Sequence, residues 1–146
     1  MSDLPHLYTV KSAGGSSGHL TSQAEGLPNI TIAPPSQFGG PGDQWSPEDL
    51  LMASVSSCLI LSFRAIAKAS KLEWHSIECE SSGVLDKVER KMQFTSVLNK
   101  VRLFIPSNES QERAQRLIIK AEETCLISNS LSCESHIECE IILRGE

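Results

Sequence analysis

WSPEDLLMASVSSCLILSFRAIAKA (residues 45–69) decides the fold of this chain. Ser46 is a favoured residue just before a helix, and Pro47 suits the first helical position. Glu48 and Asp49 place negative charge in the first turn, which the helix dipole favours. We therefore expect a helix that starts at Pro47 and runs to the end of this stretch. Because its residues are apolar or small on almost every side, we expect it to be a buried central helix.

One stripe of this helix carries mostly small side chains at helical spacing: Leu51, Ser54, Val55, Cys58, Ser62 and Ala65. Residues three and four positions apart lie on the same face of a helix. Small volumes on that face let another backbone approach closely. We expect this stripe, which includes Cys58, to face the interior.

Strands are expected on both sides of the helix. Residues 7–13 and 18–24 flank a glycine-rich turn and predict a hairpin, and residues 29–33 predict a third strand. The loop over residues 34–44 is rich in proline and glycine. Downstream, alternating apolar residues predict strands over residues 74–85, 92–105 and 134–143, with a polar turn over residues 86–90 and Val97, Val101, Leu103 and Ile105 on one face.

A second helix is expected after Pro106, capped by Asn108 and ending at Cys125. Its apolar stripe is Ala114, Leu117, Ile118, Ala121 and Cys125. The order of elements has no regular strand–helix alternation, which would favour a parallel sheet. The sequence therefore predicts an α+β fold with an antiparallel sheet packed on two long helices, in a single domain over residues 1–146.

The composition limits the classes of function that this chain can have. The chain has 146 residues, of which 40% are hydrophobic and 21% charged, as in ordinary globular domains. Its net charge of -5 and its lack of basic runs exclude phosphate-driven binding to nucleic acid. The apolar stretch over residues 50–66 is interrupted by serines and Arg64, so we expect no membrane span. No basic and apolar leader is present at the start, so we expect a cytoplasmic protein.

Five cysteines occur, at positions 58, 79, 125, 133 and 139. An odd number in a reducing compartment argues against a permanent disulfide framework. If the two helices pack together, the sulfurs of Cys58 and Cys125 come within reach of a disulfide. The alternative is that both are small hydrophobic side chains in a core.

Two motifs resemble the OsmC/Ohr family. Ser46-Pro47-Glu48 followed by two leucines and Cys58 is similar to the helix opening that precedes the family's reactive cysteine. Residues 120–131, with Cys125, look like its later motif of a helix ending in cysteine, two residues and a serine. The resemblance implies an OsmC-like domain, an intertwined homodimer and a thiol peroxidase. We expect no cofactor.

The same resemblance implies roles for individual residues. Cys58 attacks the O–O bond of an organic hydroperoxide or another small electrophile and becomes a sulfenic acid. Cys125 then forms a disulfide with it, and a dithiol reductant such as a lipoyl protein restores both thiols. Glu48 orients an arginine that lowers the pKa of the reactive thiol.

That arginine has no counterpart, because no arginine precedes Arg64. Lys11 and His19 are the candidates to replace it, although ordinary exposed strand positions explain both. Glu48 lies ten residues before Cys58, which is about 15 Å along a helix, so a partner subunit would have to bring them together. The missing arginine keeps a second function open, a redox sensor or small-molecule-binding protein with little turnover. The third possible function is that of a structural dimer whose cysteines are chemically inert.

Other clusters of chemically active side chains give weaker evidence for a functional site. His75 and Cys79 share one expected strand face, and Cys133 and Cys139 share another. Histidine and cysteine side chains are ligands that zinc prefers. Their spacings match no common zinc motif, and alternation in half-buried strands explains them as well. We therefore expect no metal, and we interpret Cys79 and Cys139 as residues that fill the core.

Overall fold

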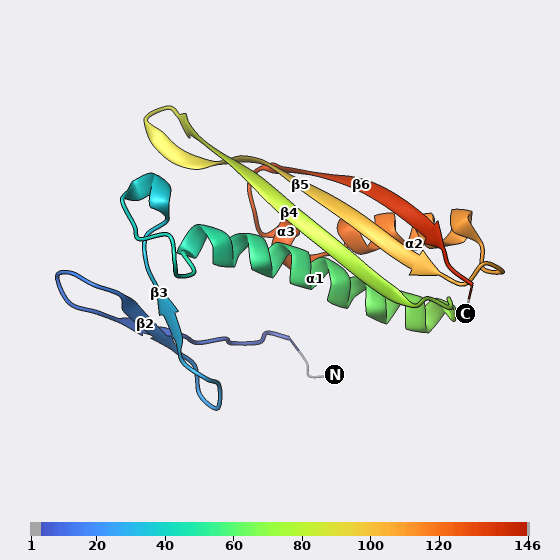
Figure 1. Cartoon of the computed structure of the whole chain (residues 1–146), viewed down its shortest axis with the longest axis horizontal. Helices are drawn as coiled ribbons and strands as arrows, with labels where there is room; N and C mark the ends of the chain where they lie inside the picture. Colours follow the sequence, from blue (N-terminus) through green and yellow to red (C-terminus); the bar gives the residue numbers. More distant parts are fainter. Residues whose placement is uncertain (1–3, 146) are drawn as a thin grey trace. The chain divides into compact units, whose positions relative to one another are not determined.

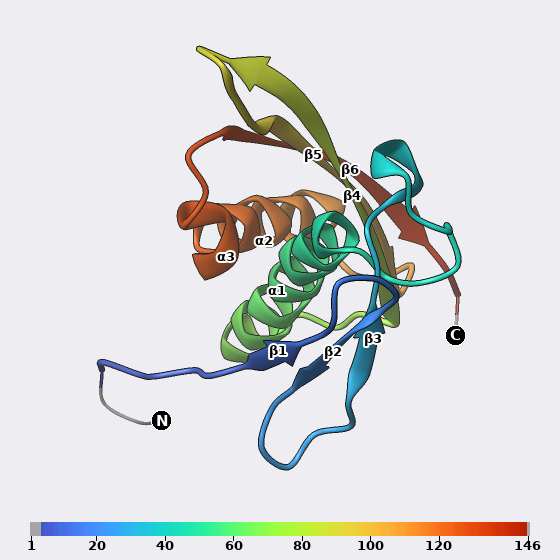
Figure 2. The same ribbon diagram turned by 90° about the vertical axis from the view of Figure 1, so that its left-hand side faces the viewer.

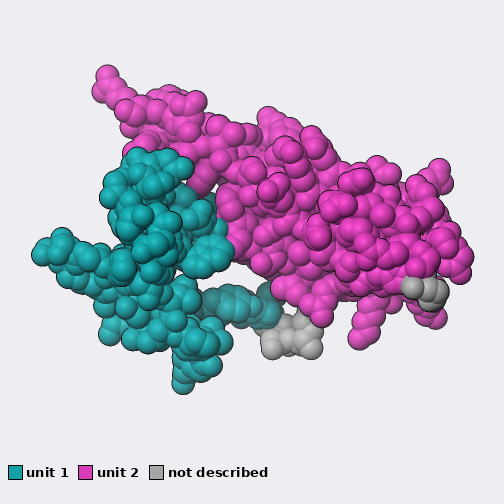
Figure 3. Space-filling model, in the orientation of Figure 1, with its two compact units in different colours: residues 1–51 teal, residues 52–146 magenta. Residues whose placement is uncertain are grey.

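The computed structural model describes residues 4–145. Its contacts divide the chain into two compact units, residues 1–51 and residues 52–146 (Figure 3). The single-domain organisation expected from the sequence stays a prediction.

The first unit holds a small antiparallel sheet in the order β1-β2-β3. Its strands are β1 (Lys11–Ala13), β2 (Leu20–Gln23) and β3 (Ile30–Ile32). Lys11 faces Gln23 in the first pair, so the expected hairpin and third strand are confirmed, with shorter bounds. The following loop contains a single 3-10 turn, η1 (Ser36–Phe38).

This unit buries few of its apolar side chains. Ile32 and Ala33 are buried, whereas Leu7, Tyr8 and Val10 are exposed. A small sheet gains stability when an apolar face packs against another element. Within this unit, few of the apolar side chains of residues 4–45 are packed in this way.

The long helix α1 (Pro47–Ser70) begins where the sequence predicts it. The Ser46 hydroxyl oxygen accepts a hydrogen bond from the Asp49 amide at 3.1 Å, and the hydroxyl donates to the Asp49 carboxylate at 3.0 Å. This reciprocal cap satisfies an amide that has no acceptor inside the helix. The predicted start of the helix is confirmed.

The face that α1 buries differs from the expected one. Its buried residues are Val55, Leu59, Phe63 and Ala67, spaced by four, and of these only Val55 belongs to the predicted stripe. Cys58 is half-buried beside this face. The expectation of a helix buried on all sides is wrong for the single chain, because the second unit covers one stripe only. By length and composition α1 would also pass as a membrane span, a test that core helices of soluble proteins meet too.

The second unit contains the larger sheet, in the order β4-β5-β6. Its strands are β4 (Ser76–Val88), β5 (Lys91–Ile105) and β6 (Glu134–Leu143). β4 and β5 form an antiparallel hairpin, and its tight turn is Glu89-Arg90, both with positive φ, rather than the five residues 86–90.

The expectation of a purely antiparallel sheet is wrong, because β6 runs parallel to β5, with Val101 facing Cys139. A parallel pair needs a long crossover, and the segment between the two strands, with its helices, provides it. The sheet is therefore mixed, and the fold is α+β with two sheets and two main helices.

The crossover contains α2 (Gln111–Glu123) and the short α3 (Leu126–Asn129). The cap of α2 is Ser110, whose hydroxyl accepts from the Arg113 amide at 3.1 Å, and not Asn108 as expected. Cys125 does not end α2. It is the residue immediately before α3, with an extended backbone, and its side chain is fully buried.

Both main helices lie on one face of the sheet (Figures 1 and 2). The core between them joins Leu59 and Phe63 of α1, Ile118 of α2, and the inner face of β5. The four β5 residues predicted to share one face, Val97, Val101, Leu103 and Ile105, are all buried, so that prediction is confirmed.

One polar residue is buried within this inner face. Asn99 of β5 is 0% exposed. Its side-chain oxygen accepts from the Ser81 hydroxyl of β4 at 2.5 Å, and its amide donates to the Ser135 hydroxyl of β6 at 3.2 Å and to the His136 carbonyl at 3.4 Å. Buried polar groups are stable when their hydrogen bonds are made, so Asn99 links all three strands.

Candidate functional site

Two sulfurs from separate elements meet in the second unit. Cys58 lies in the middle of α1, and Cys125 lies at the junction of α2 and α3. The Cys125 thiol is a hydrogen-bond partner of the Cys58 sulfur. Cys58 is half-buried and Cys125 is fully buried, so a reagent from solvent meets Cys58 first.

The surroundings of Cys58 favour its thiolate. Burial raises the pKa of Cys58, but hydrogen bonds from the Ile127 amide, the Cys125 thiol and the Ser62 hydroxyl outweigh this effect. The Leu126 amide adds a smaller contribution in the same direction. The pKa of Cys58 is therefore lower than that of an ordinary cysteine, and a larger fraction is ionised near neutral pH.

The short helix α3 explains why these two amides are available. Leu126 and Ile127 are its first two residues, and the first amides of a helix have no acceptor within it. Ser62 lies one helical turn after Cys58 on α1, so its hydroxyl shares the same face. The backbone after Cys125 and the helix that carries Cys58 thus supply the donors.

Cys125 has the opposite character. Burial raises the pKa of its thiol, and the neighbouring Cys58 raises it further, whereas the amide and hydroxyl of Ser128 act in the other direction. The net pKa of Cys125 is above the ordinary value. The arrangement therefore holds one sulfur that ionises readily beside one that keeps its proton.

The remaining predicted residues belong to the first unit. Glu48 lies in the first turn of α1, and its Oε1 atom is buried without a hydrogen-bond partner among the described residues. Along the helix, ten residues separate it from Cys58 by about 15 Å. Lys11 and His19 are exposed, which agrees with their interpretation as ordinary surface positions. The donors to Cys58 all belong to the second unit.

Sequence reasoning missed the roles of Ser62, Leu126 and Ile127. The spacing of four between Cys58 and Ser62 was a usable signal for the first. The two amides carried no signal, because they belong to a four-residue helix whose presence depends on the packing after α2.

The alternative metal site has no support in the geometry. No group of three or more His, Cys, Asp or Glu side chains within residues 4–145 is arranged to hold a metal ion. Cys79 and Cys139 pack against the core cluster, which confirms their interpretation as residues that fill the core. His75 instead contacts the Arg144 carbonyl through Nε2 at 3.2 Å.

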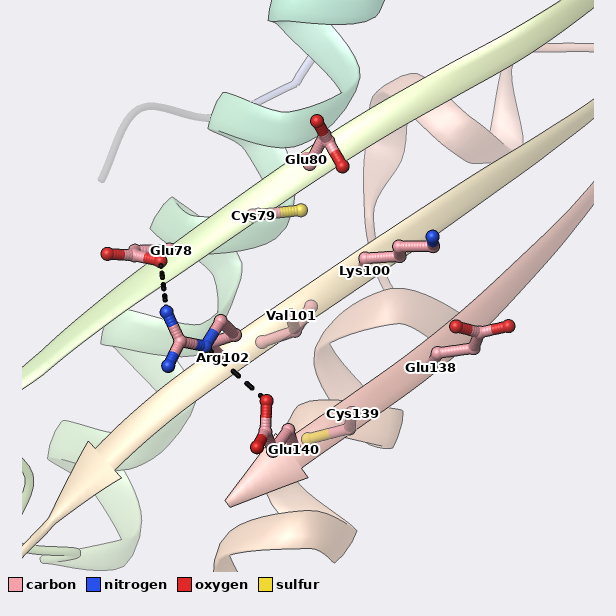
Figure 4. Close-up of a pocket in the computed structure, with 9 residues that line it drawn as sticks. All are labelled: Glu78, Cys79, Glu80, Lys100, Val101, Arg102, Glu138, Cys139 and Glu140. Carbon is pink, nitrogen blue, oxygen red and sulfur yellow. Dashed lines mark hydrogen bonds and ion pairs between the residues drawn. The ribbon is translucent and has the colours of Figure 1, made fainter. Parts of the chain in front are cut away.

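The outer face of the larger sheet carries a ladder of charges over a hollow of about 600 Å³ (Figure 4). Arg102 of β5 pairs with Glu78 of β4 and Glu140 of β6, each at 3.4 Å. All three side chains are more than half exposed, and exposed pairs contribute little to stability. The ladder is a solvated surface, away from the pair of sulfurs on the helical side.

Comparison with known proteins agrees with this architecture. The model of the family described as "OsmC-like protein" matches residues 40–140. The chain belongs to the OsmC-like family.

Among OsmC-like relatives, the uncharacterized protein YmaD of Bacillus subtilis (strain 168) is 24% identical over 146 residues, covering 97% of each chain. An OsmC-like protein of unknown function from Vibrio cholerae has a similar structure, with a TM-score of 0.85, 20% identity, and coverage of 93% of this chain and 100% of that one. An organic hydroperoxide resistance protein OsmC from Legionella pneumophila gives a TM-score of 0.75 at 23% identity, covering 97% and 100%. These likenesses show the OsmC-like fold.

Proposed function

We propose that this OsmC-like protein is a thiol-dependent peroxidase that reduces organic hydroperoxides through Cys58 and Cys125. The observation that carries the proposal is the contact between the two sulfurs, with the donors that lower the pKa of Cys58. The name of the Legionella relative, an organic hydroperoxide resistance protein, agrees with this substrate class.

The chemistry follows from the difference between the two thiols. The Cys58 thiolate attacks one oxygen of the O–O bond, forming a sulfenic acid and releasing the alcohol of the hydroperoxide after it takes up a proton. Cys125 then attacks the Cys58 sulfur, which forms the disulfide and releases water. A dithiol reductant, such as a lipoyl protein, restores both thiols by exchange and is itself oxidised.

Activation of Cys58 does not need the missing arginine in this proposal. The Leu126 and Ile127 amides and the Ser62 hydroxyl are hydrogen-bond donors to the sulfur. Hydrogen bonds to the charged form lower a pKa in the way that a nearby cation does. These donors carry no full charge, so the absence of arginine before Arg64 also favours a second candidate, a redox sensor or small-molecule-binding protein with slow turnover.

A homodimer completes the proposal. Leu61 of α1 is 57% exposed and Leu126 is 66% exposed, both near the sulfur pair in the sequence. The exposed side of α1 also carries Ser57 and Arg64, which a bilayer would not accommodate cheaply. A second copy of the chain fits better, because it would also cover the apolar side chains of residues 4–45.

The same dimer gives Glu48 a role. Its buried Oε1 has no donor among residues 4–145, and a buried carboxylate oxygen without a donor is costly. A donor from the second copy, brought close by dimerisation, would satisfy it and would orient a polar group toward the thiol site.

The location we propose is the cytoplasm, where small dithiols are kept reduced.

Counting thiols tests the proposal. Reduced protein is mixed with one equivalent of cumene hydroperoxide, free thiols are titrated, and turnover is followed with dihydrolipoamide. Rapid loss of two thiols with sustained turnover supports the peroxidase, and rapid or slow loss without turnover supports the sensor. No loss of thiols on the timescale of hours contradicts both. A Cys133→Ser variant is the matched control, because that sulfur takes no part in the proposed chemistry.

A further inference from the structure

The side chain of Ser128 is a buried polar group that has no partner in the reduced protein. Ser128 is 9% exposed, and its Oγ atom makes no hydrogen bond with any group of residues 4–145. Unpartnered buried polar groups are costly, and native proteins keep few of them. The other such side-chain atom among these residues, Oε1 of Glu48, belongs to the first unit. The Ser128 hydroxyl therefore needs an explanation within the second unit.

The turn of α3 places this hydroxyl next to Cys125. Cys125 is the residue immediately before α3, and its carbonyl accepts a helical hydrogen bond from the Asn129 amide at 3.0 Å. Ser128 is the third residue of the helix, and a side chain at that position points back toward the residue before the helix. Cys125 is fully buried, so both side chains are buried in the same turn. The hydroxyl proton is within reach of the Cys125 sulfur.

The charge on the sulfur determines how strongly these two groups interact. A neutral thiol sulfur is a weak acceptor, which agrees with the unpartnered hydroxyl of the reduced protein. A thiolate is charged and accepts much more strongly. Burial raises the pKa of Cys125, whereas the amide and hydroxyl of Ser128 act in the opposite direction. Cys58 of α1 and Cys79 of β4 are the titratable groups that interact with this sulfur.

We propose that the Ser128 hydroxyl donates a hydrogen bond to the Cys125 sulfur in the two steps of the cycle in which that sulfur is a thiolate. The inference rests on the proposed function, because both steps belong to it. It adds a residue that acts on Cys125 alone, whereas Ser62 and the Leu126 and Ile127 amides act on Cys58.

The first of these steps forms the disulfide. Cys125 loses its proton to solvent, and its thiolate attacks the sulfur of the Cys58 sulfenic acid. The S–S bond forms, the S–O bond breaks, and the released hydroxide takes up a proton to become water. Because the hydroxyl stabilises the Cys125 thiolate, Ser128 raises the fraction of protein that can make this attack.

The second step is the reduction of the disulfide. Cys58 is half-buried and Cys125 is fully buried, so a thiolate of the dithiol reductant reaches the Cys58 sulfur. A mixed disulfide forms between the reductant and Cys58, and Cys125 leaves as a thiolate with the bonding electrons. The second thiol of the reductant then displaces Cys58 and closes the oxidised reductant. A thiolate leaves faster when its pKa is lower, so Ser128 accelerates this step as well.

Quenching the reaction at intervals separates the action of Ser128 from the activation of Cys58. Reduced protein receives one equivalent of cumene hydroperoxide, is quenched in acid, and the sulfenic acid and the disulfide are counted by mass spectrometry. In Ser128→Ala the sulfenic acid should form at the unmodified rate, but the disulfide should form about three- to tenfold more slowly at pH 7. The profile of disulfide formation against pH should move to higher pH, because the pKa of Cys125 rises when the donor is lost.

Two further variants control for the structure of α3. Ser128→Thr keeps a hydroxyl at this position and should restore both the rate and the pH profile. Ser130→Ala removes a hydroxyl from the same segment, one that donates to the Leu126 carbonyl at 2.8 Å, and should close the disulfide at the unmodified rate. Because the Ser128 hydroxyl has no partner in the reduced protein, Ser128→Ala should not lower its free energy of unfolding in urea. A clear loss of stability would show a structural role and overturn the proposal.

Reduction of the disulfide tests the inference without any hydroperoxide. Diamide, which oxidises pairs of thiols, is used to make the Cys58–Cys125 disulfide, and its reduction by dithiothreitol is followed. We expect Ser128→Ala to be reduced about threefold or more slowly, and Ser130→Ala at the unmodified rate. Equal rates of closing and of reduction with and without the Ser128 hydroxyl overturn its role and leave the peroxidase standing. Slower reduction of Ser128→Ala, with no thiol lost to hydroperoxide in any of the proteins, overturns the peroxidase and supports the role of Ser128.

Discussion

The Cys58 sulfur accepts hydrogen bonds from both the thiol of Cys125 and the backbone that follows it, so one short segment supplies a reaction partner and two amide donors. The relationship exists because Cys125 stands immediately before α3 rather than inside α2. At that junction the chain leaves the helix, and the next amides are not used by helical carbonyls. A cysteine one turn earlier, within α2, would have had no such amides beside it.

Replacing Cys125 should separate the two steps of the proposed chemistry. In Cys125→Ser the Cys58 thiolate can still attack a hydroperoxide, but no second sulfur is available to form the disulfide with it. We expect a sulfenic acid that dimedone labels at Cys58, and turnover with dihydrolipoamide reduced by about 100-fold or more. In Cys58→Ser neither labelling nor turnover should remain. Equal labelling of Cys58 in the unmodified protein and in Cys125→Ser would contradict the role of Cys125.

Removing the Ser62 hydroxyl should raise the pKa of Cys58. The hydroxyl is one of the donors that hold this pKa below its ordinary value, and its loss removes part of the stabilisation of the thiolate. The rate of Cys58 alkylation by iodoacetamide, followed against pH, should therefore rise at higher pH in Ser62→Ala than in the unmodified chain. Ser57→Ala is the matched control, because that side chain is exposed and directly precedes Cys58. An unchanged profile in Ser62→Ala would remove Ser62 from the site.

Truncating Asn99 should destabilise the fold without touching the sulfurs directly. Asn99→Ala removes the buried amide and leaves the half-buried Ser81 and Ser135 hydroxyls without this partner. An unsatisfied buried polar group costs about 1–3 kcal/mol, so the free energy of unfolding in urea should fall by about 2 kcal/mol. Lys100→Ala, on the exposed face one residue away, should change it by less than about 0.5 kcal/mol. Similar values for the two variants would show that the three-strand network contributes little.

A charge on the exposed side of α1 should prevent the proposed homodimer. Leu61 is 57% exposed, and Leu61→Glu would place a carboxylate where the proposal buries an apolar side chain. Analytical ultracentrifugation should give twice the chain mass for the unmodified protein and a lower mass, or a dissociation constant at least about 100-fold weaker, for the variant. Gln115→Glu, on the exposed side of α2, is the control and should remain dimeric. A monomeric unmodified protein at micromolar concentration would contradict the proposal directly.

The sequence by itself determined the local starts and stops. Ser46 and Pro47 define the beginning of α1 because a cap and a proline act on neighbouring amides, whatever the rest of the chain does. The alternation of Ile137, Cys139 and Ile141 with charged residues indicates β6, whose observed bounds are the predicted ones. The two motifs around Cys58 and Cys125 were also sufficient to indicate the family, which the match over residues 40–140 confirms.

Only the tertiary structure decided which faces and ends meet. α1 is apolar on most sides, so its pattern could not select the stripe Val55, Leu59, Phe63 and Ala67, and packing against the sheet and α2 selected it. The parallel pairing of β6 with β5 depends on where the crossover returns the chain, which is a long-range property. The donors to Cys58 depend on the same return, because the turn after α2 brings the Leu126 and Ile127 amides to a sulfur more than sixty residues earlier in the chain.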